Sequence, residues 1–508
     1  MPHFLQAGPM QVRYENGFLR YMTIGDSEIL RMIYVAIRDR NWQTTTLVIL
    51  NETIEQSPDS FRVNYDWETN DLGIQMTGHV AIQGNTDGVI TVDFYGKAVN
   101  DFQKNRIGLC VLHPAHDVLG QSAEVTSPDG SLLMGHFPTF ISPNQPFLAM
   151  KTFRWQSASG SVWQLDFSGD VFEMEDQRNW TDASFKTYST PVALPFPVAV
   201  SVGDEFRQQV IFGQTKQSFS GEPSEPESRK WAAALDSAKP TRPQFGVGQR
   251  TGGPALTATE ANLLKPLNLS HLRTDVFFSL PDWSRLLSDA IADAELLEVP
   301  LELAVFFGEE PLTELHLLQT VLREQNAEVG SILLFEAATL TTSDELLKTV
   351  VPELRTEWAG LAIGGGTDDH FAGLNRNHFN TDWVDFVTYS VCPQAHATDE
   401  LTITENIAGL LPTVLTARQF GGGKPIHISP VAFKPRNITV ANVADERQTN
   451  VADPRQATEF GAEWTRQSLT ALADAGVASI TCYQSHGPGG LVNGDTVYPV
   501  YDAVGSLQ

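Results

Sequence analysis

The sequence has little cysteine, and it lacks both a long apolar run and a charged leader. Three cysteines in 508 residues, Cys110, Cys392 and Cys482, are odd in number, far apart and without CxxC spacing, so they support neither a disulfide framework nor a zinc finger. No window approaches the roughly 20 apolar residues that span a bilayer, and the first residues do not resemble a secretory signal. These absences predict a soluble, cytoplasmic protein that does not contact a membrane.

Positive charge is also scarce. The 34 basic residues are outnumbered by 61 acidic ones, and the net charge is -27. Because no Lys/Arg run breaks this excess, the chain would repel a phosphate backbone, which excludes nucleic acid as an expected partner. A small anionic substrate stays compatible, since single arginines dominate the field at contact distance.

Length and composition indicate a globular protein of more than one domain. The apolar fraction is 42% and the charged fraction 19%, both ordinary for packed proteins. A chain of 508 residues exceeds one ordinary core, and two large units fit it best.

The first part of the chain has the pattern of an antiparallel β domain. From Gln11 to Gln217, short alternating segments such as GVITVDFYGKAV and VWQLDFSGDVFEM are separated by turn clusters such as GNTDG and SPDGS. We place this β-sandwich domain at residues 1–222. The following stretch, at 223–243, is rich in Pro, Ser and charge and predicts a linker.

The second part, at residues 244–508, alternates short apolar runs with longer helical patterns. The runs are FGVGQ, HLRTDV, LELAVFF, SILLFEA, LAIGGG, FVTYSV, IHISPV and SITCYQS. Eight such βα units in this length predict a closed (β/α)8 TIM barrel. A doubly wound open sheet is the alternative, but the first turn, GVGQRTGG, is not the GxGxxG fingerprint of a dinucleotide site.

Because barrel active sites form at the carboxyl ends of the strands, chemistry is expected in the residues that follow each run. Glu336 follows the fourth run and is the candidate acid of a glycosidase, which needs two carboxylates about 5 Å apart when it retains configuration. The seventh run instead leads to Lys434 and Arg436, without an acidic residue. This argues against ordinary glycoside hydrolysis, and Glu336 is alternatively a rim carboxylate paired with a base.

The basic seventh-strand end suits a substrate that develops negative charge at an oxygen, as the carbonyl of an ester or lactone does when water attacks it. Lys434 and Arg436 are therefore candidate catalytic residues. The alternative is a salt bridge to one of three rim carboxylates, Asp368, Asp369 or Asp399.

A base that activates water is expected among His396 and the rim carboxylates. His396 precedes Asp399 by three positions, so a carboxylate can orient its imidazole. Asp369 and Glu336 are the carboxylate candidates. His370 and His396 can alternatively hold a metal with Asp368 and Asp369, but no compact ligand motif supports this, and we expect neither a metal nor another cofactor.

Two polar segments are candidate substrate-binding regions. Asn375 and Arg376 can hydrogen-bond hydroxyls and carboxylates, with loop capping and surface pairing as alternatives. The segment Phe172–Pro191 combines planar polar groups with aromatics, as sugar sites do, and we expect it to reach the barrel rim, with an inter-domain salt-bridge network as the alternative. The full set of predicted substrate-binding residues is Glu175, Asp176, Arg178, Asn179, Trp180, Lys186, Asn375, Arg376 and Asp399.

Several strings resemble the D-apionate lactonase family. EDQRNWTDASFKTYSTP, NDFQKNRIGLCVLHP, ISPNQPF and ALPFPVAV resemble its N-terminal domain, and GGGTDDHFAGLNRN, CPQAHATDE, SPVAFKPRN and DPRQATEFGAEWT continue the resemblance through the barrel. The resemblance implies a sugar-mutarotase-like β domain before a glycosidase-like barrel. It also implies hydrolysis of D-apionolactone in apiose catabolism. The family is expected to continue into a C-terminal β domain and to carry an acidic residue and a basic segment where this chain has Gln484–Pro488.

We therefore expect a lactone hydrolase that opens D-apionolactone or a related aldonolactone to the sugar acid. The alternatives are a glycoside hydrolase that acts on a small glycoside, motivated by Glu336, and a non-catalytic sugar-binding relative, motivated by the altered end of the eighth strand.

Overall fold

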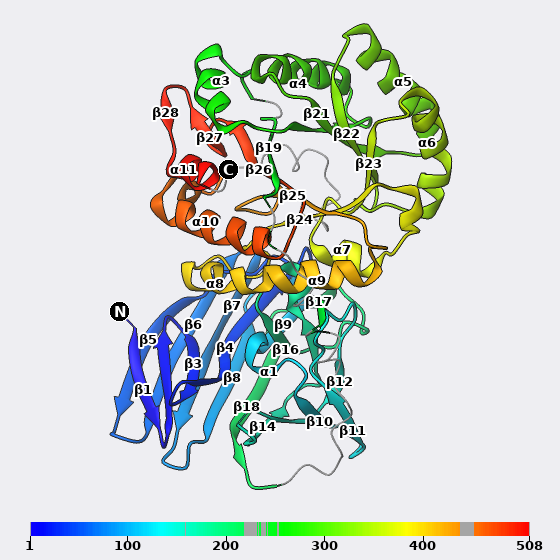
Figure 1. The fold of residues 1–508 in the computed structure, drawn as a ribbon. Coiled ribbons are helices and arrows are strands. Elements are labelled where there is room, and N and C mark those ends of the chain that lie inside the picture. The colour runs from blue at the N-terminus through cyan, green and yellow to red at the C-terminus, as the bar shows by residue number, and fades with distance from the viewer. Residues whose placement is uncertain are drawn as a thin grey trace. The chain divides into compact units, whose positions relative to one another are not determined.

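The computed structural model describes residues 2–157, 159–217, 231, 233–234, 240, 242–250, 253–436 and 452–506 (Figure 1). The chain forms two compact units. One contains Met1–Gln177 and Ala183–Ala232, and the other contains Arg178–Asp182 and Ala233–Gln508. The linker predicted at 223–243 lies mostly outside the described residues.

The N-terminal unit contains two antiparallel sheets. In order of pairing, the first is β1 (His3–Ala7), β2 (Met10–Glu15), β3 (Phe18–Ile24), β4 (Ser27–Asp39), β9 (Phe102–Pro114), β16 (Ser184–Tyr188), β15 (Phe172–Asp176) and β12 (Phe147–Met150), with β17 (Val198–Val200) also on β9. The second is β11 (Leu132–His136), β10 (Ser122–Thr126), β13 (Thr152–Gln156), β14 (Val162–Ser168), β18 (Glu205–Thr215), β8 (Ile90–Ala98), β7 (Ile74–Gly84), β6 (Phe61–Asp71) and β5 (Val48–Gln56). Its sheets are accompanied by the short helix α1 (Ala115–Val118), and the 3-10 turn η1 (Gln177–Trp180) follows β15 at the point where the chain passes into the other unit.

Alternation in the sequence explains these strands. In β6, Phe61, Val63, Tyr65 and Trp67 are buried, whereas the residues between them are exposed or half-buried. Successive strand residues point to opposite faces, so one face of the sheet enters the core. Trp67 stacks on Phe94 of β8 with the ring centroids 5.7 Å apart. The predicted antiparallel β domain is confirmed.

The second unit is a closed parallel barrel. Its strands are β19 (Gln244–Gly248), β20 (Leu272–Phe277), β21 (Leu301–Phe307), β22 (Val329–Glu336), β23 (Ala362–Gly366), β24 (Phe386–Val391), β25 (Ile426–Val431) and β26 (Ser479–His486). Each pairs with the next, and β19 pairs with β26, which closes the circle. A hairpin of β27 (Gly490–Asn493) and β28 (Thr496–Val497) extends from β26. The eight-stranded barrel is confirmed, because all eight predicted runs form its strands.

The barrel helices surround these strands (Figure 1). They are α3 (Ala258–Leu264), η2 (Lys265–Leu267), α4 (Trp283–Leu297), α5 (Pro311–Glu324), α6 (Asp344–Glu357), α7 (Phe371–Arg376), η3 (Thr381–Trp383), α8 (Glu400–Glu405), η4 (Asn406–Gly409), α9 (Leu410–Phe420), η5 (Pro454–Ala457), α10 (Glu459–Asp474) and α11 (Pro499–Gly505). None of the helices in the described ranges is long and apolar enough to cross a membrane.

Candidate active site

Four charged side chains form a ring at the barrel strands. Arg273 and Asp275 lie two residues apart on β20 and therefore share a face. Asp368 follows β23 and Arg436 follows β25. Arg273 contacts both aspartates, donating to Asp275 from Nε at 3.1 Å and Nη2 at 3.0 Å and forming a short ion pair with Asp368. Arg436 closes the ring through an ion pair with Asp275 and a 3.2 Å bond to Asp368.

Contacts within the ring favour the charged forms of Arg273 and Asp275 despite burial. Burial alone would lower the pKa of Arg273, but Asp368 and Asp275 outweigh this effect and raise that pKa. Burial likewise opposes ionisation of Asp275, whereas Arg436 and Arg273 lower its pKa. The ring therefore holds two guanidinium and two carboxylate groups in fixed positions.

A hydrogen-bonded chain supports this ring from inside the barrel. Arg273 donates from Nη1 to Ser429 Oγ at 3.0 Å, and Ser429 donates to Glu302 Oε1 at 2.5 Å. Thr481 also donates to Glu302 Oε1, at 3.1 Å, and its hydroxyl lies 2.7 Å from Nε2 of His271. Because these side chains are all buried and bonded, they restrict the rotamers that Arg273 can adopt.

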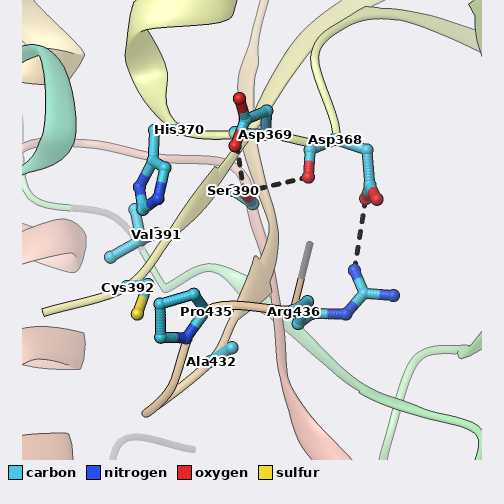
Figure 2. A pocket seen from close by; sticks show the side chains of 9 residues that line it. All are labelled: Asp368, Asp369, His370, Ser390, Val391, Cys392, Ala432, Pro435 and Arg436. Carbon is cyan, nitrogen blue, oxygen red and sulfur yellow. Dashed lines mark hydrogen bonds and ion pairs between the residues drawn. The ribbon is translucent and has the colours of Figure 1, made fainter. Parts of the chain in front are cut away.

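A pocket lies next to the ring, and its volume is about 250 Å³ when the space open to solvent is included. Figure 2 shows its lining residues, which are Asp368, Asp369, His370, Ser390, Val391, Cys392, Ala432, Pro435 and Arg436. They come from the carboxyl ends of β23, β24 and β25, the edge where a barrel carries its chemistry.

The turn after β23, which carries Asp368, Asp369 and His370, is fixed by a close backbone approach and by hydrogen bonds. A Cβ on Gly366 would lie 1.7 Å from the carbonyl oxygen of Thr388, so this position accepts only glycine. Ser390 then donates to the carbonyl oxygens of Asp369 at 2.7 Å and Asp368 at 3.2 Å (Figure 2). Gly366 thus allows β23 to approach β24, and the Ser390 hydroxyl holds the backbone of the pocket wall.

Residues Arg178–Asp182 belong to the barrel unit although they lie far upstream in the sequence. Asn375 donates from Nδ2 to Asn179 Oδ1 at 2.9 Å, and Thr181 donates to the carbonyl of Cys392 at 2.9 Å. A Cβ on Gly409 would lie 2.4 Å from the Thr181 carbonyl oxygen, so the small residue admits the segment. The segment therefore contacts the loops after β23 and β24.

His396 bonds to a carboxylate that its local sequence does not contain. Its Nδ1 lies 2.6 Å from Oδ2 of Asp182, which also accepts from Asn406 at 3.0 Å. Asp399 instead caps α8, accepting from the backbone and hydroxyl of Thr402. The ring of His396 meets the ring of Trp180 edge-on at 5.3 Å.

The other predicted substrate-binding residues lie in two groups. In the barrel unit, Arg376 places its guanidinium 5.0 Å from the ring centre of Trp180, while Arg178 is fully buried. In the N-terminal unit, Glu175 and Lys186 form an ion pair across β15 and β16, and Asp176 accepts from the backbone of Ser142 at 3.0 Å. Substrate contact by any of these residues stays a prediction.

The remaining catalytic candidates are placed as follows. Glu336 accepts hydrogen bonds from Ser343 and Thr339, both in its own βα loop, and Lys434 is exposed. His370, Asp368 and Asp369 do not join a set of three metal-ligand atoms within 4.8 Å of one another. The one such set within the described residues is Glu28, His116 and Asp117 of the N-terminal unit.

Both units match domain models of one family. Residues 1–217 match the D-apionate lactonase N-terminal domain, and residues 245–508 match the D-apionate lactonase TIM barrel domain. The chain belongs to the D-apionate lactonase family. A curated D-apionate lactonase of Brucella anthropi is 28% identical to it over 519 residues, covering 97% of this chain and 84% of the relative.

Solved structures resemble this D-apionate lactonase family member only weakly. An α-galactosidase from Lactobacillus brevis has a TM-score of 0.29 at 10% identity and covers all of this chain and 82% of its own. An endo-β-1,4-mannanase from Thermotoga petrophila has a TM-score of 0.34 at 9% identity and covers 54% of this chain and 77% of its own. Scores this low carry no conclusion about activity.

Sequence reasoning missed three charged residues of this family member's barrel, namely the buried Arg273 and Glu302 and the half-buried Asp275. They lie within runs interpreted as continuously apolar strands, HLRTDV and LELAVFF. A signal was present, because the i, i+2 spacing of Arg273 and Asp275 places both side chains on one strand face. Charged groups inside a closed barrel need partners, and such a pair therefore marks the interior.

Proposed function

We propose that this protein hydrolyses D-apionolactone or a related aldonolactone to the open sugar acid. The observation that carries the proposal is that both of its units match the corresponding D-apionate lactonase domains. The pocket supplies groups that suit this chemistry, with Arg436 as a cation and Asp369 as a carboxylate on its lining. We further propose a cytoplasmic role in apiose catabolism, in keeping with three free, buried cysteines.

In the reaction, water adds to the lactone carbonyl carbon and a base takes one of its protons. The carbonyl electrons move onto oxygen, and Arg436 stabilises the resulting oxyanion. When the tetrahedral intermediate collapses, the ring C–O bond breaks and the leaving alkoxide takes up a proton. The product is a hydroxy acid, which ionises to the carboxylate in neutral water.

We also propose roles for the other predicted residues. Among described residues, no hydrogen bond or ion pair engages the carboxylate of Asp369, which can therefore accept bonds from water or substrate. Asn375 and Arg376 can hold hydroxyl groups at the rim, together with the segment that contains Trp180. His396 and Glu336 are alternative bases, and Lys434 is an additional cation near the seventh strand end.

The direct test incubates the purified protein with a panel of aldonolactones that includes D-apionolactone and follows acid release above the spontaneous rate. Arg436→Gln should lower kcat/KM by about 100-fold or more, because loss of one oxyanion donor costs about 10²–10³ in rate. Arg466→Gln is the matched control, since Arg466 lies on α10 in an exposed pair with Glu463. If the unmodified protein opens none of the lactones faster than buffer, the proposal is wrong.

A further inference from the structure

His370 lines the pocket without a structural task of its own. It is the N-cap residue of α7, a position where Ser, Thr, Asp and Asn usually bond to the first turn, but its side chain makes no capping bond. Within the described residues, no hydrogen bond or ion pair holds its imidazole. The local fold therefore does not require a histidine at this position.

The surroundings of His370 are those of a reaction site. Figure 2 shows its imidazole on the side of the pocket that Val391 and Cys392 line, with Arg436 on the other side of the view. Burial raises the pKa of the Cys392 thiol, which keeps it protonated and disfavours it as a nucleophile. The imidazole of His370 and the guanidinium proposed to stabilise the oxyanion thus line one pocket.

We propose that His370 is the general base and acid of lactone opening, an inference that rests on the proposed function. A ring nitrogen of His370 takes a proton from the attacking water as the oxygen bonds to the lactone carbon. When the ring C–O bond breaks, the imidazolium returns that proton to the alkoxide. The histidine ends the cycle in its starting state, and water is the only co-reactant.

Imidazole suits both steps better than a carboxylate does. Histidine is the side chain whose ordinary titration lies between pH 5 and 8, so it can accept a proton from water and then donate one to an alkoxide. His396 is bonded at Nδ1 to Asp182 and does not line the pocket. Asp369, the neighbouring carboxylate, is then free to hold substrate hydroxyls.

The experiment compares His370→Ala with the unmodified full-length chain on the best lactone of the panel. The variant should lose about 100-fold or more in kcat/KM, the usual contribution of a general acid–base group. Imidazole added to the buffer should raise kcat/KM of His370→Ala by at least about tenfold, because the alanine leaves space for it. His378→Ala is the matched control, since His378 lies in the same βα segment, is exposed and stacks on Phe420.

A pH profile provides the second readout. In the unmodified protein kcat/KM should fall on the acidic side as the base is protonated, and His370→Gln should remove this limb. The other ionisable groups that line the pocket, Asp368, Asp369, Cys392 and Arg436, remain in the variant.

The results of these experiments distinguish failure of the proposed function from failure of the inference about His370. Lack of lactone opening by the unmodified protein overturns the proposed function and this inference with it. An active protein whose His370→Ala variant keeps more than a third of kcat/KM overturns the inference alone. If both variants lose most of their activity, an acidic limb that persists in the remaining rate of His370→Gln, together with a lack of imidazole rescue of His370→Ala, also overturns the inference.

Discussion

Arg273 is the side chain on which the charged ring of the barrel depends most. Its side chain is only 2% exposed, and it contacts Asp275, Asp368 and Ser429. Removing one partner of a buried ion pair leaves an uncompensated charge, which costs about 3–5 kcal/mol. We expect Arg273→Met to lower the free energy of unfolding by about this amount, as measured by urea denaturation.

Arg436→Gln provides the contrast, because the Arg436 side chain is 25% exposed and water can solvate the groups it leaves. Arg436→Gln should lower the free energy of unfolding much less than Arg273→Met does. It should lower kcat/KM for lactone opening more. Equal losses of stability in the two variants would contradict the division into a buried support and a substrate-facing cation.

At this scale the sequence predicts residue types better than partners. Arg436 was predicted as a rim cation with a salt bridge to Asp368 as one alternative, and the structure shows that ion pair. The carboxylate on His396 was expected three residues away, at Asp399, but it is Asp182, 214 residues upstream. Spacing along a helix or strand reveals neighbours on one element only, and this contact joins two distant segments.

At the scale of elements, the pattern of apolar and polar residues was sufficient to predict the strands of both units. All eight barrel strands were predicted because parallel strands covered on both faces are short apolar runs between helical patterns. The sandwich strands followed from period-two alternation. The charged interior was less visible, because one or two charged residues inside an apolar run do not change its overall period.

A buried histidine on β9 leads to a prediction about how the stability of the N-terminal unit depends on pH. His113 on this strand is fully buried among Phe137, Phe153 and Trp155, and burial lowers its pKa to about 3 from 6.5. The folded state then binds fewer protons than the unfolded chain, so the N-terminal unit loses stability as pH falls below about 6.5, by at most about 1.4 kcal/mol per pH unit.

His113→Phe should remove this contribution, because phenylalanine has no proton to bind in either state. Thermal melts between pH 7 and pH 5 measure the effect, and the melting temperature of the variant should decline less than that of the unmodified protein. Parallel declines would show that other groups govern the acid sensitivity of this unit.

At the scale of the whole molecule, the two units are not separable at the linker. A fragment of residues 244–508 contains the barrel strands but lacks Arg178–Asp182, which belong to that unit. Asn375, His396 and Asn406 would each lose a hydrogen-bond partner, at about 1–3 kcal/mol for each buried group left unsatisfied. We expect the fragment to melt several degrees below the barrel transition of the full chain, or to fail to fold.

Differential scanning calorimetry of the fragment and the full chain makes the comparison. A second sample is the full chain with Asp182→Ala. The melting temperature of its barrel transition should also fall, by less than in the fragment. A fragment as stable as the barrel of the full chain would show that the five-residue segment is dispensable.

The upstream position of these five residues also affects the order of events on the ribosome. Asp182 is translated 224 residues before Asn406, one of its hydrogen-bond partners. At about 5–20 residues per second, this delay is of the order of 10–45 s. During this time the Asp182 carboxylate lacks the amide of Asn406, and this contact cannot form until η4 has emerged. Ribosome pauses placed in the interval would therefore lengthen the period in which the segment is open to chaperones and proteases.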